Sequence, residues 1–304
     1  MKYKYTFTIF TPTYNRVDKI DRVYDSLKKQ TFRDFEWLVV DDGSLDDTKE
    51  LITKWREESN FSIRYIYQDN KGKHIAFNNG VKHAQGRFFL PADSDDEFLE
   101  DALKILYDTW KSINNKEEYS GVTGLCIDAN TGKIVGDQYP SDIFDSTTLE
   151  STYTYNIQGE KWGFHKTDVL KKFPFPQFGE EKFSLESFVW TAIGRKYKTR
   201  YINQPLRIYY QNEGENLSSI AITYPLSSME WYMFEINNNF DYLIKNRKKF
   251  LIAFINLGRM QIHAKKDFMV TIRRLNSFNK KIIFMSIYLF SRLFAMKDKK
   301  EGRV

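Results

Sequence analysis

Residues 35–44 read FEWLVVDDGS, a mostly apolar run that stops at two carboxylates, a glycine and a serine. A short apolar run bounded by turn-forming polar residues is typical of a buried strand in a parallel sheet. Leu51, Ile52 and Trp55 follow at helical spacing, so the next segment is predicted to be a helix. The stretch therefore predicts one strand–helix unit.

The same alternation surrounds this unit. Further strands are predicted at residues 5–11, 63–67 and 87–90, and further helices at 17–27, 75–84 and 98–113. Strands that alternate with helices indicate an α/β fold, here a doubly wound, mostly parallel sheet with helices on both faces.

The pattern changes after the predicted helix at 98–113. Strands are predicted at 121–127 and near 134, an irregular segment at 140–155, a helix at 184–196 and an extended segment at 200–210. From Pro225 onward every periodic segment predicts helix. We expect residues 1–100 and 101–215 to form two halves of one domain, and residues 216–304 to form a helical, basic C-terminal extension.

The composition is that of a globular protein. Hydrophobic residues make up 41% and charged residues 28% of the 304 positions, which argues against disorder. The single cysteine, Cys126, cannot form an internal disulfide, so we expect a reducing, cytoplasmic location. No run of about 18 apolar residues occurs, and no conventional transmembrane helix is expected.

The net charge of +6 is the sum over two regions of opposite charge. Residues 241–304 hold 16 basic and 4 acidic residues, whereas residues 1–240 hold 30 basic and 36 acidic ones. Within the basic region, residues 280–296 (KKIIFMSIYLFSRLFAM) are apolar and aromatic between flanking lysines. We expect residues 280–300 to make a peripheral contact with a membrane through apolar residues and lysines. The alternative is a buried helix that packs on the domain or on a partner. No nucleic-acid partner is expected, because the body is acidic and no recognition motif is present.

Three loops follow predicted strands, where ligands bind in open α/β sheets. The loop TPTYNR at 11–16 offers hydroxyls, an aromatic ring and a cation to a nucleobase or phosphate, although a capped helix start would also explain it. The loop VVDDGS at 39–44 offers a carboxylate to a ribose or a base N–H, with helix capping by Asp46 as the alternative.

The third loop is PADSDDE at 91–97, in which four of the last five residues are acidic. Such carboxylates repel one another unless a cation or a helix N-terminus offsets them. Two carboxylates together with diphosphate oxygens suit Mg²⁺ or Mn²⁺. The loop therefore predicts a divalent metal with a diphosphate, or else a solvated acidic helix start.

The order and spacing of these motifs resemble the family 2 glycosyltransferases with the GT-A fold. The matching segments are TPTYNR, QTFRDFE (30–36), LVVDDGSLDDT (38–48), NKGKH (70–74), NNG (78–80), AQG (84–86) and ADSDDE (92–97). The resemblance is close over the first hundred residues and thins beyond Glu100. It implies that residues 1–100 bind a nucleotide-sugar and that residues 101–215 bind the acceptor and supply the catalytic base.

The resemblance also implies roles for individual residues. Donor-binding roles fall on Pro12, Thr13, Tyr14, Arg16, Asp41, Asp42, Lys73, His74, Asn78, Asp93, Ser94 and Asp95. Asp95 and Asp96 would hold the metal, and which of the two is the direct ligand stays open. A histidine in an ordinary first helical turn is the alternative for His74.

The implied base is Glu186, four residues before Trp190, with Glu181 as a competing candidate. Burial beside Phe183, Phe188 and Trp190 would raise its pKa toward neutrality, whereas the alternative is an exposed helical glutamate. Trp162 and His165 would stack on an acceptor sugar, unless they belong to the core.

The reaction that the resemblance implies is an inverting single displacement from a nucleotide-sugar, expected to be a UDP-sugar, with Mn²⁺ or Mg²⁺ as cofactor. The acceptor would be a saccharide or a lipid-linked saccharide in surface polysaccharide synthesis, at the inner face of the cytoplasmic membrane. The alternatives are a non-catalytic sugar-nucleotide-binding protein and a nucleotidyltransferase. Against the latter, the first strand is not followed by a glycine-rich phosphate loop.

Overall fold

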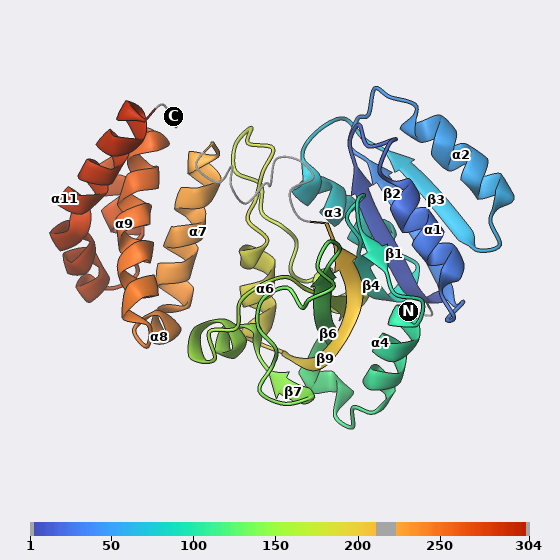
Figure 1. Cartoon of the computed structure of the whole chain (residues 1–304). Helices are drawn as coiled ribbons and strands as arrows, with labels where there is room; N and C mark the ends of the chain where they lie inside the picture. Colours follow the sequence, from blue (N-terminus) through green and yellow to red (C-terminus); the bar gives the residue numbers. More distant parts are fainter. Residues whose placement is uncertain (1–2, 211–222, 302–304) are drawn as a thin grey trace. The chain divides into compact units, whose positions relative to one another are not determined.

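The structure, a computed structural model, describes residues 3–210 and 223–301, and the chain divides into two compact units (Figure 1). Unit 1 comprises Met1–Ser151, Ile157–Phe175 and Thr191–Glu213. Unit 2 comprises Thr152–Asn156, Pro176–Trp190 and Gly214–Val304.

A mixed sheet forms the centre of unit 1. Its strands in the described residues are β1 (Tyr5–Thr13), β2 (Phe35–Asp41), β3 (Ser62–Tyr67), β4 (Gly86–Pro91), β5 (Glu97–Phe98), β6 (Tyr119–Asp128), β7 (Ile143–Ser146), β8 (Lys161–Lys166) and β9 (Lys198–Tyr209). The order is β3-β2-β1-β4-β8-β6-β9-β5, and β7 pairs with β9. The first four strands are all parallel, and Thr13 lies opposite Asp41 at their carboxyl ends. The predicted α/β sheet is confirmed.

Helices cover both faces of this sheet because alternate strand residues point to opposite sides. The helices of unit 1 are α1 (Asp21–Lys29), α2 (Thr48–Glu58), α3 (Lys73–His83), α4 (Ala102–Lys111) and α5 (Thr167–Leu170), with a 3-10 turn at Lys116–Glu118. One core cluster joins Phe7 and Ile9 of β1 to residues of α1, α2 and α4. Phe10, the next residue of β1, instead meets Phe77 of α3, with ring centroids 5.5 Å apart.

The one charged residue in the apolar part of the quoted strand is held by neighbours. Glu36 is fully buried, accepts a hydrogen bond from the Thr8 hydroxyl at 2.6 Å, and pairs with Arg64 at 2.9 Å. The Gln85 amide also donates to it, at 2.7 Å. Because a buried carboxylate must be paired or hydrogen-bonded, Glu36 ties β2 to β1, to β3 and to the turn before β4.

Three features depart from the predicted elements. β8 was not predicted, and it inserts antiparallel between β4 and β6. The segment predicted as irregular contains β7 and a π-helical turn at Glu150–Thr154. Ile134 makes only an isolated bridge to Ile127. These elements are short and depend on pairing with distant strands, which a local sequence pattern does not record.

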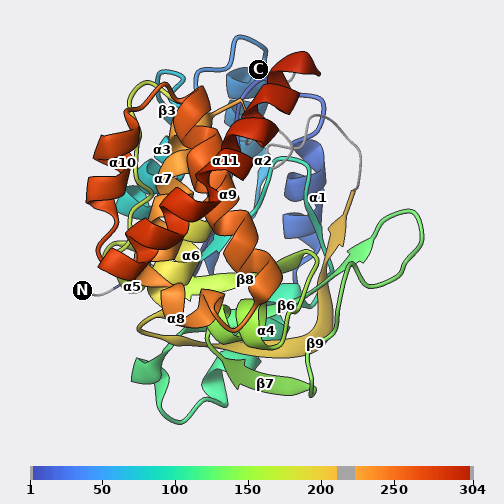
Figure 2. The same ribbon diagram turned by 90° about the vertical axis from the view of Figure 1, so that its left-hand side faces the viewer.

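Unit 2 is built from helices. They are α7 (Pro225–Asn238), α8 (Phe240–Leu243), α9 (Arg247–His263), α10 (Phe268–Arg274) and α11 (Phe278–Lys300), while α6 (Ser187–Gly194) crosses the boundary between the units. α9 lies between α7 and α11 (Figures 1 and 2). Asn246, Asp267 and Ser277 cap α9, α10 and α11 by accepting hydrogen bonds from backbone amides. The predicted helical C-terminal extension is confirmed.

None of the helices in the described ranges combines the length and the apolar composition needed to cross a bilayer.

Candidate active site

The first two loops at the strand ends are joined by hydrogen bonds. The Asp42 amide donates to the Thr13 carbonyl at 2.8 Å. The Asn15 amide donates to the Ser44 hydroxyl at 2.9 Å, and the Leu45 amide donates to the Asn15 side chain at 2.7 Å. Asn15 adopts a positive φ of 51°, which asparagine tolerates better than most residues. The TPTYNR and DDGS motifs thus form one connected surface.

Both carboxylates of the second loop are buried and already hydrogen-bonded. Asp41 accepts from the Ser44 amide at 2.7 Å and from the Tyr65 hydroxyl at 2.6 Å. Asp42 accepts from the Gln68 side chain and from the Lys71 and Gly72 amides, at 2.7, 2.9 and 2.7 Å. These bonds hold the loop before α3 in place. The nucleotide contact of Asp42 remains a prediction. Asp42 would have to make that contact while keeping these hydrogen bonds.

Beside Asp42 lie polar atoms that have no such partners. His74 and Thr13 are buried, and within the described residues neither ring nitrogen of His74 nor the Thr13 hydroxyl has a hydrogen-bond partner. Burial lowers the pKa of His74, and the nearby Asp42 carboxylate opposes that effect. An unsatisfied buried polar group costs about 1–3 kcal/mol, so these atoms are candidates for ligand contacts.

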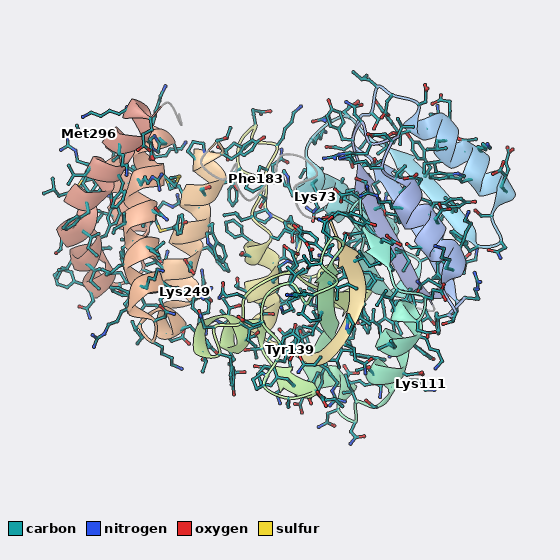
Figure 3. All side chains as sticks on the ribbon, viewed as in Figure 1. Lys73, Lys111, Tyr139, Phe183, Lys249 and Met296 are labelled. Atoms are coloured by element: carbon teal, nitrogen blue, oxygen red, sulfur yellow. The ribbon has the colours of Figure 1, made fainter. Side chains whose placement is uncertain are left out.

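Lys73 begins α3 (Figure 3) and pairs with Asp93 of the acidic loop, with its ammonium nitrogen 2.8 Å from a carboxylate oxygen. Burial acts to raise the pKa of Asp93, but the cations of Lys73, Arg207 and Arg16 outweigh it, and the pKa of Asp93 lies below its usual value. Arg16, Lys73 and Asp93, which were predicted to bind the sugar donor, therefore lie close enough for their charges to interact.

Asp96 forms a buried ion pair that the sequence did not predict. Each of its carboxylate oxygens lies 3.2 Å from the same Arg207 nitrogen, and one also accepts from the Asp93 amide at 2.9 Å. Burial raises the pKa of Asp96 to about 7, while Arg207 acts in the opposite direction. The second guanidinium nitrogen of Arg207 reaches Glu160 at 3.1 Å.

Asp95 differs from both neighbours. Its side chain is partly exposed, and it makes no hydrogen bond with any other described residue. The repulsion predicted for the acidic loop is thus offset by two protein cations, Lys73 and Arg207, and not by a metal alone. Sequence reasoning missed Arg207 and Glu160; the only hint was a charged residue between Leu206 and Ile208 in an extended segment.

Three of the predicted contacts take structural roles. The Asn78 side chain donates to the Phe175 carbonyl at 2.9 Å and accepts from the Phe175 amide at 2.8 Å. The side-chain amide of Asn78 therefore connects α3 to the backbone at Phe175. We do not retain Asn78 as a donor contact.

Trp162 and His165 both lie in β8. Trp162 is buried, stacks on Phe98 with ring centroids 4.5 Å apart, and donates to the Pro91 carbonyl at 2.7 Å. A ring nitrogen of His165 lies 3.1 Å from the Ser120 hydroxyl, and burial lowers the pKa of His165 to about 4. The core alternative describes these side chains, and neither is retained as an acceptor contact.

Both base candidates belong to unit 2. Glu181 accepts hydrogen bonds from the Leu226 and Ser227 amides at 2.9 and 2.7 Å, and so caps the N-terminus of α7. Glu186 directly precedes α6, and the Trp190 indole donates to it at 3.3 Å. Because the side chain of Glu186 is exposed, its predicted burial is wrong. Glu181 is occupied by capping, which leaves Glu186 as the better candidate.

A metal site made by protein side chains alone is not present in the described part of the chain, where no three His, Cys, Asp or Glu side chains are grouped to hold an ion. Any metal at the acidic loop would need oxygens from the bound ligand.

Comparison with known proteins gives the class to which this fold and site belong. The model of the glycosyl transferase family 2 matches residues 8–159, half of the chain. The chain therefore belongs to the family 2 glycosyltransferases.

Two curated relatives are named as glycosyltransferases. One, the GalNAc(5)-diNAcBac-PP-undecaprenol β-1,3-glucosyltransferase of Campylobacter jejuni, is 29% identical over 66% of this chain and 63% of its own length. The other, the poly(ribitol-phosphate) β-N-acetylglucosaminyltransferase TarS of Staphylococcus aureus, is 30% identical over 71% of this chain and 38% of its own length. The chain thus spans less than two thirds of either relative.

Solved structures show the same fold. A complex of S. aureus TarS residues 1–349 with UDP-GlcNAc aligns with a TM-score of 0.56 at 19% identity, covering 98% of this chain and 92% of the other. The mannosyltransferase PcManGT of Pyrobaculum calidifontis, in complex with GDP-Man and Mn²⁺, aligns with a TM-score of 0.56 at 15% identity, covering 98% and 88%. At these identities the likeness shows the GT-A fold alone.

Proposed function

We propose that this glycosyltransferase inverts configuration, depends on a divalent metal, and transfers a sugar from UDP to a saccharide or a lipid-linked saccharide in surface polysaccharide synthesis. The family supports the transfer of a sugar. The Campylobacter relative is named for a substrate linked to undecaprenol diphosphate, and TarS for poly(ribitol phosphate), which supports an acceptor of this kind.

The observation that carries the proposal is the group of polar atoms left without partners where the strands of unit 1 end. His74, Thr13 and Asp95 have such atoms in the described structure, whereas Asp41, Asp42 and Asp96 are fully engaged. A nucleotide offers donors and acceptors to a neutral histidine and a hydroxyl, and its diphosphate offers oxygens to a metal beside Asp95.

The acidic loop fits a divalent metal through Asp95, with Asp93 as its neighbour. Asp96 is the poorer candidate because both of its oxygens contact Arg207. Two carboxylates with diphosphate oxygens make the all-oxygen set that Mg²⁺ and Mn²⁺ prefer. When bound, the metal would stabilise the negative charge on the leaving diphosphate.

The protein's own residues supply the remaining chemistry. Glu186 takes the proton from the acceptor hydroxyl, whose oxygen forms the new bond to the anomeric carbon while the bond from that carbon to UDP breaks. One carboxylate suffices for this single displacement, which inverts the anomeric configuration. Lys73, held by Asp93, offers a cation to the donor phosphates.

The test is the release of UDP from a panel of UDP-sugars with Mn²⁺, with and without saccharide acceptors. Glu186→Gln removes the base and should lower the rate about 10²–10⁴-fold. Glu180→Gln, which removes another exposed carboxylate from the same segment, should leave the rate unchanged. Wild-type-like turnover in Glu186→Gln would dismiss the base. UDP binding without turnover of any donor would favour a non-catalytic sugar-nucleotide-binding protein.

We also propose that the protein is cytoplasmic and attaches peripherally to the inner face of the membrane, where a lipid-linked acceptor would be found. The proposed reaction does not require this attachment.

A further inference from the structure

α11 has two unlike faces, and the first of them packs on α9. Ser291 lies so close to Gly258 that a Cβ added at Gly258 would sit 2.5 Å from the Ser291 hydroxyl. Further along, Asp298 forms two 2.5 Å hydrogen bonds with Arg259 and lies 2.9 Å from a ring nitrogen of His263. The predicted alternative, a helix that packs on the protein, therefore describes one side of α11.

The opposite face of α11 is apolar and exposed. Its residues recur every three or four positions, so they share one side of the helix. They are Phe278, Ile282, Met285, Leu289, Leu293 and Met296, each between 43% and 74% exposed, and we call them the apolar face. Met296 lies on the side of α11 away from α9 (Figure 3), and α11 lies in front of α9 in Figure 2. A continuous apolar stripe of this kind usually marks an interaction site.

Basic residues border the apolar face. Arg292, Lys297, Lys299 and Lys300 are exposed on the same helix. The carboxylates of α11 and the residue after it do not balance them: Asp298 is buried against Arg259, and Glu301 is a single exposed acid 3.8 Å from Lys297. The border of the apolar face is therefore positively charged.

We infer that the apolar face of α11 binds an anionic membrane surface, with the helix lying flat in the headgroup layer. The apolar side chains would enter the acyl boundary while the bordering cations contact acidic headgroups. The helix would not cross the bilayer, because its other face holds the Arg259–Asp298–His263 group against α9. This inference concerns unit 2 alone. Its outcome is independent of the proposed reaction.

Other occupants fit the charges less well. In a symmetric contact between two copies, the cations at residues 292–300 would face another α11, whose only carboxylate, Asp298, is buried, so they would gain no acidic partner. A nucleic acid would match the charge but would leave six apolar side chains facing phosphates. An anionic bilayer satisfies both the apolar stripe and its border.

The experiment is flotation of the full chain with vesicles of phosphatidylcholine alone or of phosphatidylcholine with phosphatidylglycerol, at low and high salt. Wild type should float with the anionic vesicles and be released by salt. Leu289→Glu with Leu293→Glu, and separately the triple change Lys297→Gln, Lys299→Gln and Lys300→Gln, should each reduce binding about tenfold or more. Ile143→Glu in β7, where the side chain is 56% exposed, is the matched control and should bind like wild type.

Circular dichroism and thermal melting test whether each variant is folded. If the leucine variant is unfolded, the lysine variant alone tests whether α11 binds the membrane. Equal flotation of wild type and both variants would overturn the inference, as would failure of wild type to float with anionic vesicles. A stable wild-type dimer in lipid-free solution that Leu289→Glu with Leu293→Glu converts to monomer would make the apolar face a self-interface, which also overturns it.

Discussion

The acidic loop of unit 1 and the α9–α11 pair of unit 2 each contain a buried aspartate held by an arginine from a distant segment. Arg207 holds Asp96 in the first region, and Arg259 holds Asp298 in the second. In both regions the ion pair fixes a framework, and the neighbouring groups left without partners face outward: Asp95 in one, the apolar face in the other. The comparison teaches that, in these two regions, the buried carboxylate held by an arginine belongs to the scaffold, while the adjacent groups without such a partner are the candidates for binding.

The largest expected effect breaks the pair in unit 1. Arg207→Gln leaves the buried Asp96 without its cation and also removes the ion pair with the exposed Glu160, which should lower the free energy of unfolding by about 3–5 kcal/mol. Denaturant unfolding followed by tryptophan fluorescence measures it. Arg56→Gln, at an exposed position of α2, should change that free energy by less than about 0.5 kcal/mol. A loss below about 1 kcal/mol for Arg207→Gln would contradict a scaffold role.

The corresponding change in unit 2 should have a smaller effect. Arg259→Gln removes two charge-assisted hydrogen bonds, but Asp298 keeps His263, so we expect a loss of about 1.5–3 kcal/mol. Arg274 pairs with Glu230 at a more exposed position, and Arg274→Gln should lower the free energy of unfolding by at most about 1 kcal/mol. Thermal and denaturant unfolding compare the two. Equal losses would show that burial does not distinguish these pairs.

The smallest effect concerns pH. The folded-state pKa of His165 is about 4, below the ordinary value of 6.5, so the unfolded chain takes up the proton first. The stability contributed by the neutral ring is complete above pH 6.5 and is lost as the pH falls toward 4.

Because His165 is partly exposed, we expect it to account for only about 1 kcal/mol of the stability lost between pH 7 and pH 5. His165→Asn should lose correspondingly less stability over that range, measured by denaturant unfolding at both pH values. Identical pH profiles for the two proteins would show that His165 does not titrate as described.

Local patterns were enough to predict the first half of the fold. The apolar run of β2, the helical spacing after it and the polar residues at its end all lie within about twenty residues, so the strand, the helix and the loop could be read together. The same holds for the start of the acidic loop, because the carboxylates that define it are adjacent. The helices after Pro225 were predicted for the same reason.

Long-range contacts explain what could not be predicted. Arg207 lies 111 residues from Asp96 in the sequence, and nothing near either residue indicates the other. β8 is short and gains its place by pairing with β4 and β6. The exposure of Glu186 and the separation of α11 into a packed and an apolar face depend on which neighbours cover each side, and a hydropathy pattern does not carry that information.

The most direct test of the difference between engaged and unengaged carboxylates is calorimetric titration of UDP in the presence of Mn²⁺ onto wild type, Asp95→Asn and Asp96→Asn. Asp95→Asn should weaken metal-dependent binding about tenfold or more without changing the melting temperature. Asp96→Asn should mainly lower the melting temperature, because it disturbs the contact with Arg207. Metal-dependent UDP binding that survives in Asp95→Asn and is lost in a folded Asp96→Asn would contradict the assignment of Asp95 to the site and of Asp96 to the scaffold.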